Sequence, residues 1–443
     1  MDAVLLDKLR ASVGPAHVLS GVDLSPYVVD GRTPEAAVFP ESIDEIRAVV
    51  AGAAEARVPV MAWGGGTAVA VGSPPREPGI VLGLARLNRL LEHEPGDLTV
   101  TVQAGMTVSA LQTALCDHGQ WLSLDPPDAE RATLGGIIAA NASEPRRHLY
   151  GTARDLLIGV TVVIGDADVV RGGGKVVKNV AGYDLPKLFI GSQGTLGVIV
   201  EMTLKLRPLP EAERFLAVPF ECLKDAAAAV RGLMMSDLMP NAIELLDTEA
   251  SRALGAPLAP LPAPATLVVG FDGLREQVDW QCAELLRVTT PFGARAAQPL
   301  SPEACARLGT AARDALTESA AVMRISTVPT QVGEIMGQGA EVARARGLTA
   351  AWSAHAGTGV LTGVLSRPRD RGEAAAVVAV LTEWRAAARA SGGYATLEWA
   401  PLAVKSQVPV WDDLGAAGRL MRRIKERLDP HDILNPGRFV GET

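Results

Sequence analysis

The stretch "MAWGGGTAVAVG", residues 61–72, directly follows the apolar residues VPV and contains three consecutive glycines. The run VPVMAW is typical of a buried strand. Successive glycines let neighbouring backbone N–H groups turn to one side, which makes a nest for an anion. A plain tight turn would explain the same residues. The choice between the two interpretations depends on whether other segments supply a site for the same ligand.

Two further glycine-rich tracts follow in the first half of the chain. "DPPDAERATLGGIIAANAS", residues 125–143, contains two adjacent glycines, and "RGGGKVVKNVAGYDLPKLFIGSQGTLGVI", residues 171–199, contains two glycine clusters. Strands and helices disfavour glycine, so three such tracts beside predicted strands indicate one large, elongated ligand that approaches the backbone closely. No G-x-G-x-x-G opens a predicted helix and no GKS or GKT occurs, which argues against the Rossmann and P-loop motifs.

Composition narrows the class of protein. The 443 residues include 48% hydrophobic and 21% charged residues, which is typical of a globular protein with more than one domain. A net charge of −8 argues against a nucleic-acid partner. The four cysteines contain no C-x-x-C pair, so we expect no cysteine metal site. The N-terminus has no basic start or long apolar run, which predicts a cytoplasmic protein without a transmembrane segment.

The pattern of elements predicts an α+β fold with three parts. Short strands rich in Val, Ile and Leu, separated by helices and glycine turns, fill residues 1–209. Strand–helix–strand repeats over 210–410 favour an antiparallel sheet with helices on one face, a ferredoxin-like arrangement. The remaining segment, 411–443, is predicted to be a helix and an extended tail that returns to the first part of the chain.

Together the tracts resemble the FAD-binding domain of the vanillyl-alcohol oxidase family, the PCMH-type domain, over about residues 35–208. VFPESIDEI is similar to the entry motif of the family, and WGGGT to its pyrophosphate loop. ATLGGIIAANAS with YGTARDLLIG is similar to its flavin wall, and GSQGTLGVI to its adenine-side strand. The resemblance implies an FAD cofactor bound by these residues: Gly64, Gly65, Gly66, Thr67, Ala68, Pro126, Thr133, Gly135, Gly136, Asn141, Gly151, Asn179, Val198 and Ile199.

The same resemblance implies that FAD is bound non-covalently. Some members of the family tether the flavin through a histidine that follows the glycine pair of the pyrophosphate loop. Thr67 occupies that place in this sequence.

Within the family, KVVKNVAGYDLPKL is similar to the subunits of bacterial glycolate oxidase, most of all to the accessory FAD-binding subunit. The closing ILNPGRF matches the tail of members that oxidise 2-hydroxy acids. This resemblance implies a small 2-hydroxy acid substrate and two partner chains, a catalytic flavoprotein paralogue and an iron–sulfur subunit. Peripheral membrane association would then come through the complex.

The sequence departs from the catalytic relatives in the second domain. Those relatives carry H-x-G-D-G-N-x-H and a later E-H-G, whereas this chain reads HAGTGVL at 355–361 and EWA at 398–400. Proton abstraction from a 2-hydroxy acid needs a nearby base, and a divalent metal needs more than one imidazole. We therefore predict no metal site and a chain that depends on a catalytic partner. The alternatives are a non-catalytic assembly scaffold and a stand-alone FAD-dependent D-2-hydroxyacid dehydrogenase.

Three residues are candidates for catalysis, each with a structural alternative. His355 is either a base above the flavin or a core histidine, and we favour the core interpretation because its partner residues are missing. Arg324, on a predicted strand, either binds a substrate carboxylate through two hydrogen bonds or forms a salt bridge. Lys178, with Asn179 beside it, either faces the flavin or ties its loop together by hydrogen bonds.

Overall fold

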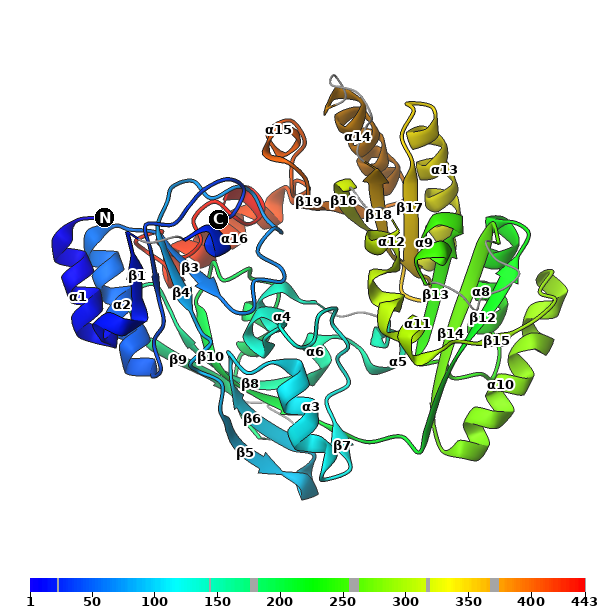
Figure 1. Ribbon diagram of the computed structural model, residues 1–443, viewed down its shortest axis with the longest axis horizontal. Coiled ribbons are helices and arrows are strands. Elements are labelled where there is room, and N and C mark those ends of the chain that lie inside the picture. Colours follow the sequence, from blue (N-terminus) through cyan, green and yellow to red (C-terminus); the bar gives the residue numbers. More distant parts are fainter. Residues whose placement is uncertain are drawn as a thin grey trace. The chain divides into compact units, whose positions relative to one another are not determined.

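The computed structural model describes residues 1–21, 24–142, 145–175, 182–254, 263–315, 319–366 and 374–442. The chain forms two compact units (Figure 1). The first unit comprises Met1–Ser143, Gly151–Leu209 and Asp413–Thr443, and the second comprises Glu144–Tyr150 and Pro210–Asp412. In the described part of the chain no helix is both long and apolar enough to cross a membrane.

Two larger sheets organise the first unit, and β7 and β11 form a third sheet of two strands. One has the order β1-β2-β4-β3, and β4 runs parallel to both of its neighbours. The other is antiparallel, with the order β5-β6-β10-β8-β9. The strands of the unit are β1 (Val18–Ser20), β2 (Ala36–Val38), β3 (Val60–Trp63), β4 (Ile80–Gly83), β5 (Leu90–Glu94), β6 (Thr99–Gln103), β7 (Gln120–Trp121), β8 (Leu157–Val163), β9 (Val169–Gly173), β10 (Val198–Lys205) and β11 (Arg207–Pro208).

Helices pack beside these sheets and close the core of the first unit. They are α1 (Ala3–Val13), α2 (Ile43–Ala56), α3 (Val108–Cys116), α4 (Leu134–Ala140), α6 (Ala153–Leu156), α7 (Pro186–Phe189) and α16 (Ala416–Leu428). Helix α2 has both a side-chain cap and a buried apolar face. Its N-cap is Ser42, whose side chain accepts a hydrogen bond from the N–H of Glu45, and its apolar face is fully buried at Ile46 and Val49.

The C-terminal segment belongs to the first unit. Its residues after α16 add a short parallel bridge to β3: the N–H of Val60 donates to the carbonyl of Ile433 at 2.7 Å, and the N–H of Asn435 donates to the carbonyl of Val60 at 3.0 Å. Figure 1 shows this segment, in red, beside the blue strands β3 and β4. Strand β3 is the strand that leads into the three glycines.

The second unit is built on one eight-stranded antiparallel sheet with the order β15-β12-β14-β13-β17-β18-β16-β19. The strands are β12 (Ala212–Phe220), β13 (Ala242–Asp247), β14 (Ala265–Gly273), β15 (Gln298–Pro299), β16 (Ser319–Ser326), β17 (Ala350–His355), β18 (Val360–Ser366) and β19 (Tyr394–Trp399). The helices are α5 (Arg147–Tyr150), α8 (Leu223–Met234), α9 (Thr248–Ala253), α10 (Arg275–Thr289), α11 (Pro302–Arg307), α12 (Ala311–Asp314), α13 (Val332–Arg344), α14 (Ala374–Ala390) and α15 (Leu402–Lys405).

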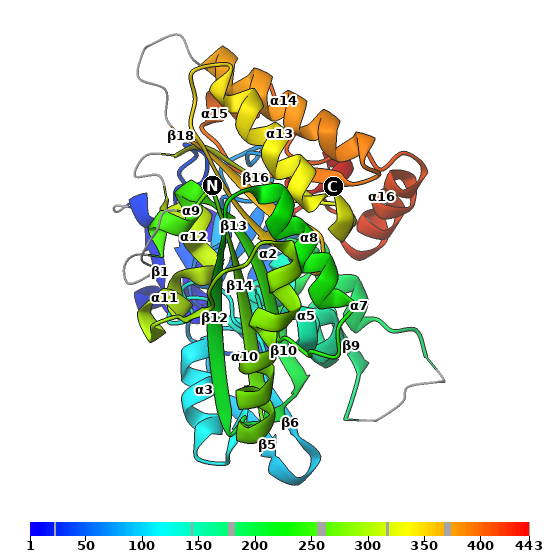
Figure 2. The ribbon, with the colours of Figure 1, turned by 90° about the vertical axis from the view of Figure 1, so that its right-hand side faces the viewer.

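The α+β class is confirmed, but the expectation of helices on one face only is wrong. Helices α8, α10, α13 and α14 share one buried cluster with the sheet, whereas α9 and α12 share another. Figure 2 shows α13 and α14 side by side, with α9, α11 and α12 gathered apart from them. The reason lies in the strands: Leu245 and Leu246 point to opposite faces of β13 and both are fully buried, so each face needs a cover.

Candidate functional site

A cavity that is open to solvent lies in the first unit and encloses about 780 Å³ of atom-free space, part of it bulk solvent. It is bounded by the glycine loop after β3, by α4 and by the start of β10. The lining residues are Met61, Ala62, Trp63, Gly64, Gly65, Gly66, Thr67, Ala68, Val69, Val71, Leu84, Thr133, Gly135, Gly136, Ala139, Ala140, Gln193, Gly194, Gly197, Ile199, Asn435 and Arg438. All three glycine-rich tracts of the sequence contribute to it.

The glycine loop presents a row of unused backbone donors to this cavity. Among the residues that the structure describes, none of the backbone N–H groups from Gly64 to Val69 donates to another protein group. The N–H of Val71 donates to the carbonyl of Ala68 at 3.1 Å and closes the loop. Successive free N–H groups on one concave surface bind anions, and phosphate is the common occupant of such nests.

Two of the loop glycines are required by their surroundings. A Cβ atom on Gly65 would lie 1.7 Å from the carbonyl oxygen of Arg131, so no other residue fits without moving that backbone. Gly66 has a φ of 74°, a left-handed conformation that favours glycine. Arg131 also donates from Nη2 to the carbonyl of Gly65 at 3.1 Å, which holds the loop against the start of α4.

Helix α4 brings the second tract against the same cavity. Thr133 is its N-cap and accepts a hydrogen bond from the N–H of Gly136 at 3.4 Å. Gly135 packs on the strand-end residue Ala104, where a Cβ atom would lie 2.7 Å from the Cβ of that alanine. The absence of side chains on this side leaves backbone exposed to the cavity, which suits a flat ligand.

The structure brings together most, not all, of the residues that the sequence predicts for FAD. The loop residues 64–68, the α4 residues Thr133, Gly135 and Gly136, and Ile199 all line the cavity. Four other predicted residues do not line it: Pro126, Asn141, Gly151 and Val198. Lys178 and Asn179 lie outside the described residues.

Three of these exceptions have a local reason. Val198 precedes Ile199 on β10, so it points to the opposite face and is fully buried in the core. Asn141 ends α4 in a left-handed conformation with a φ of 51°. Gly151 has a φ of 76° and lies directly against the carboxylate of Asp155, which leaves no space for a side chain at this position.

The sequence interpretation missed several lining residues. Gln193, Gly194 and Gly197 belong to a tract that the sequence did single out, so the signal was present there. Asn435 and Arg438 come from the C-terminal segment, and only its predicted return to the first part of the chain pointed towards them.

In the second unit, His355 forms a buried pair with a carboxylate. Its Nδ1 lies 2.7 Å from Oε1 of Glu244, and the two residues are 8% and 1% exposed. Pairing of β13 with β17 sets them directly opposite each other. A second histidine, His148, lies close to Gly357, and its burial lowers its pKa. Nδ1 of His148 is buried and makes no hydrogen bond within the described structure.

Arg324 is engaged in an ion pair within the second unit. Its Nε lies 2.9 Å from Oε1 of Glu398, and Nη2 of Arg313 contacts the other oxygen of that carboxylate. The side chain of Glu398 is only 9% exposed. The structure therefore shows the salt bridge that was the alternative interpretation of Arg324. Within the described ranges, no group of three or more His, Cys, Asp or Glu residues could hold a metal ion.

The first-unit cavity fits FAD. Its row of free N–H groups suits the two phosphates, and its glycine-lined backbone, which a Cβ atom would block, suits a flat ring. A family model described as "FAD binding domain" matches residues 34–173, and one described as "FAD linked oxidases, C-terminal domain" matches residues 209–439. Fold, pocket and matches define an FAD-dependent oxidoreductase. The chain belongs to the family of FAD-linked oxidases.

Relatives and solved structures agree with this family. The chain is 31% identical to a glycolate oxidase subunit GlcD of Bacillus subtilis, over 92% of this chain and 89% of the relative. It is 29% identical to a D-lactate dehydrogenase of Anaerostipes hadrus, over 98% and 97% of the two chains. A substrate-bound structure of p-cresol methylhydroxylase shares the fold, with a TM-score of 0.80, 20% identity and coverage of 98% of this chain and 96% of that chain.

Proposed function

We propose that this chain is an FAD-binding subunit of a 2-hydroxy acid dehydrogenase complex of the glycolate oxidase type. The relatives named as a glycolate oxidase subunit and a D-lactate dehydrogenase support the substrate class, because glycolate and D-lactate both carry a hydroxyl next to a carboxylate. The electrons would pass from the acid through FAD towards an iron–sulfur partner. A second flavoprotein chain would supply the catalytic groups, and the complex would work in the cytoplasm.

The first unit would serve as the FAD-binding domain and the second as the substrate or partner domain. The N–H groups of Gly64 to Ala68 would bind the two phosphates, and α4 with Ile199 would bound the rest of the cofactor. Five other residues that the sequence predicts for FAD would either contact the cofactor or support the residues that do: Pro126, Asn141, Gly151, Asn179 and Val198. Bound FAD supplies an acceptor for two electrons and a proton.

The observation that carries the accessory role is the pairing of Arg324 and Arg313 with Glu398. A 2-hydroxy acid needs a cation for its carboxylate, and arginine is the residue best suited to it. Here an internal carboxylate already lies against that arginine and is nearly buried. Binding a substrate at Arg324 would require displacing Glu398 into a less favourable place, which opposes catalysis by the isolated chain.

One observation favours a second candidate, a stand-alone D-2-hydroxyacid dehydrogenase. A carboxylate held against one ring nitrogen of a histidine raises the ability of the other nitrogen to accept a proton, and His355 and Glu244 have this arrangement. In the proposed accessory role, the pair of His355 and Glu244 would only stabilise the packing of β13 beside β17. A scaffold that retains FAD without passing electrons is the third possibility.

Purification of the tagged chain from its natural host tests the proposal. We expect it to co-purify in constant ratio with a second flavoprotein and with protein-bound iron and acid-labile sulfide. The complex should reduce a dye when glycolate or D-lactate is added. A chain that purifies alone and reduces the dye at a rate typical of an enzyme would contradict the accessory role and favour the stand-alone dehydrogenase.

A further inference from the structure

The C-terminal segment closes one side of the FAD cavity. Two of its residues, Asn435 and Arg438, line the cavity, although they follow the glycine loop by more than three hundred residues in the sequence. The bridge to Val60 aligns this segment with β3, the strand that ends at the loop. The segment therefore lies where it can contact both the glycine loop and a ligand bound to that loop.

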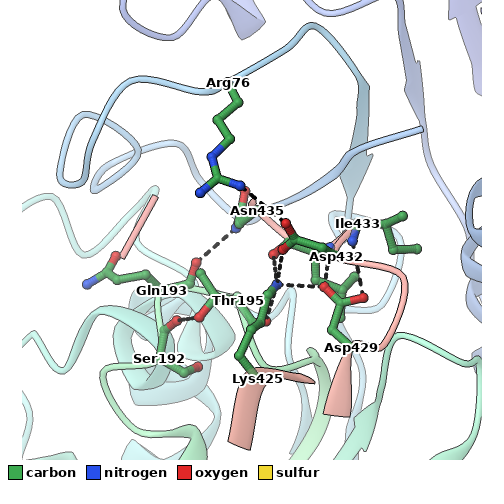
Figure 3. Close-up of polar contacts among 10 residues, drawn as sticks. Arg76, Ser192, Gln193, Thr195, Lys425, Asp429, Asp432, Ile433 and Asn435 are labelled. Carbon is green, nitrogen blue, oxygen red and sulfur yellow. Dashed lines mark hydrogen bonds and ion pairs between the residues drawn. The ribbon is translucent and has the colours of Figure 1, made fainter. Parts of the chain in front are cut away.

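A buried ion pair holds the segment in place (Figure 3). Nζ of Lys425 donates to the carboxylate of Asp429 at 2.6 Å and to the carbonyls of Leu434 at 2.7 Å and Thr195 at 2.9 Å. The carboxylate of Asp429 accepts from the N–H groups of Ile433 and Leu434. Because Thr195 belongs to the third glycine tract, this network fixes the segment to a part of the chain that also lines the cavity.

Asn435 carries a buried acceptor without a partner. Its Nδ2 donates to the carbonyl of Gln193 at 2.8 Å, and since a carbonyl only accepts, this bond fixes the orientation of the amide. The other end, Oδ1, is buried and has no hydrogen-bond partner within the described structure, while the residue is 7% exposed. Buried acceptors are almost always satisfied, so this oxygen needs a donor that no described residue of the protein supplies.

Arg438 hydrogen-bonds to backbone carbonyls of the residues that follow the three glycines. Its guanidinium donates to the carbonyls of Ser73 at 3.0 Å and Val71 at 2.8 Å and also contacts the carbonyl of Val69. The N–H of Ser73 in turn donates to the carbonyl of Arg438 at 2.9 Å. Burial lowers the pKa of Arg438 to about 10, so the guanidinium stays charged at neutral pH. A cation that draws the loop carbonyls to itself keeps them away from bound phosphates.

We propose that the C-terminal segment is part of the FAD site, with Asn435 as a binding residue and Arg438 as a positioning residue. Oδ1 of Asn435 accepts a hydrogen bond from a sugar hydroxyl of the cofactor, because the ribityl and ribose hydroxyls are the donors that flank the two phosphates. Arg438 holds residues 69–73 in the conformation that leaves the loop N–H groups free. This inference rests on FAD occupying the first-unit cavity and does not depend on the substrate.

Asn435→Leu, with Asp432→Asn as its control, tests the binding role. Asp432 lies in the same segment with its side chain half-exposed, pairs with Arg76 and, at 3.5 Å, with Lys425, and does not line the cavity. We expect Asn435→Leu apoprotein to bind FAD on the order of three- to tenfold more weakly, as for the loss of one hydrogen bond, and to gain less thermal stability when FAD is added. The control should bind FAD as tightly as the unaltered protein does, because it loses one contact of the Lys425 network and keeps the cavity lining intact. An unchanged dissociation constant for FAD, with only a lower melting temperature of the apoprotein, would overturn the proposal.

Arg438→Lys tests the positioning role, because it keeps the charge and loses most of the hydrogen bonds. We expect weaker binding of FAD and ADP, which carry the diphosphate, and unchanged binding of riboflavin, which has no phosphate. Equal weakening for all three ligands, or none, would show that Arg438 does not act on the phosphate loop. Should Gly65→Val retain full flavin, the cavity itself would be wrong, a failure distinct from that of Asn435 or Arg438.

Discussion

Arg324 and Glu398 lie 2.9 Å apart on neighbouring strands of the second unit, and the carboxylate also holds Arg313. The arginine that the sequence suggests for a substrate carboxylate is thus satisfied by a carboxylate of its own chain. In the proposed accessory role, this pairing would leave Arg324 engaged and unable to bind a substrate carboxylate.

The first prediction follows from this pair. Glu398→Gln removes the charge that two arginines share, and we expect it to lower the free energy of unfolding by about 1–3 kcal/mol, because a partly buried cation loses its partner. Added D-lactate or oxalate should restore part of the loss by supplying a carboxylate. Thermal melts with and without these anions provide the measurement.

The exposed pair of Glu249 and Arg252 gives the control. Glu249→Gln should change stability by no more than about 0.5 kcal/mol, and its melting temperature should not respond to oxalate. An equal response of both variants would mean that the arginines of the second unit do not form an anion site when freed.

The phosphate loop gives the second prediction. Gly65→Val should abolish flavin retention, since its side chain would collide with the carbonyl of Arg131, 1.7 Å from the first added atom. Gly96 provides the matched control, because a Cβ atom added there would meet nothing within 4 Å. Gly96→Val should purify with full flavin, measured by absorbance at the flavin bands against protein. Full flavin in Gly65→Val would refute the assignment of the loop.

The sequence predicted the α+β class and much of this site, but not the contacts between residues that are distant in the sequence. Glycine tracts are a local signal, so the loop of residues 64–68 and the α4 residues could be predicted. Arg438 hydrogen-bonds to Val71, which is 367 residues away in the sequence. The pairing of His355 with Glu244 depends on which strands become neighbours in the sheet. No local sequence pattern predicts either contact. The residues of β5, LLEHE, give no local signal for a strand, because they are largely exposed and lack the apolar alternation that marks one.

A third prediction concerns the attachment of the cofactor. Thr67 stands where some relatives carry a tethering histidine, so we expect FAD to be bound non-covalently. Acid precipitation should release the flavin into the supernatant, where its absorbance and mass identify FAD. A yellow pellet that keeps its flavin after washing would contradict this.

The fourth prediction concerns the anchor of the C-terminal segment. Lys425 and Lys8 each lie 2.6 Å from a carboxylate, but the first pair is buried and the second is exposed. Lys425→Met should lower the free energy of unfolding by about 3–5 kcal/mol, because Asp429 is left buried and unpaired. Lys8→Met should change it by less than about 1 kcal/mol. Denaturant unfolding of the two apoproteins makes the comparison, and similar losses would refute the anchoring role.

The most direct test of the accessory role is anaerobic mixing of the isolated, flavin-loaded chain with glycolate and with D-lactate while flavin absorbance is followed. Dithionite serves as the control, because it should bleach the flavin and show that it is reducible. General-base assistance typically accounts for a factor of about 10² to 10⁴ in rate, so a chain that relies on a partner for it should stay yellow over the time in which a catalytic relative is fully reduced. Rapid and complete bleaching by either acid, without any partner chain, would contradict the account.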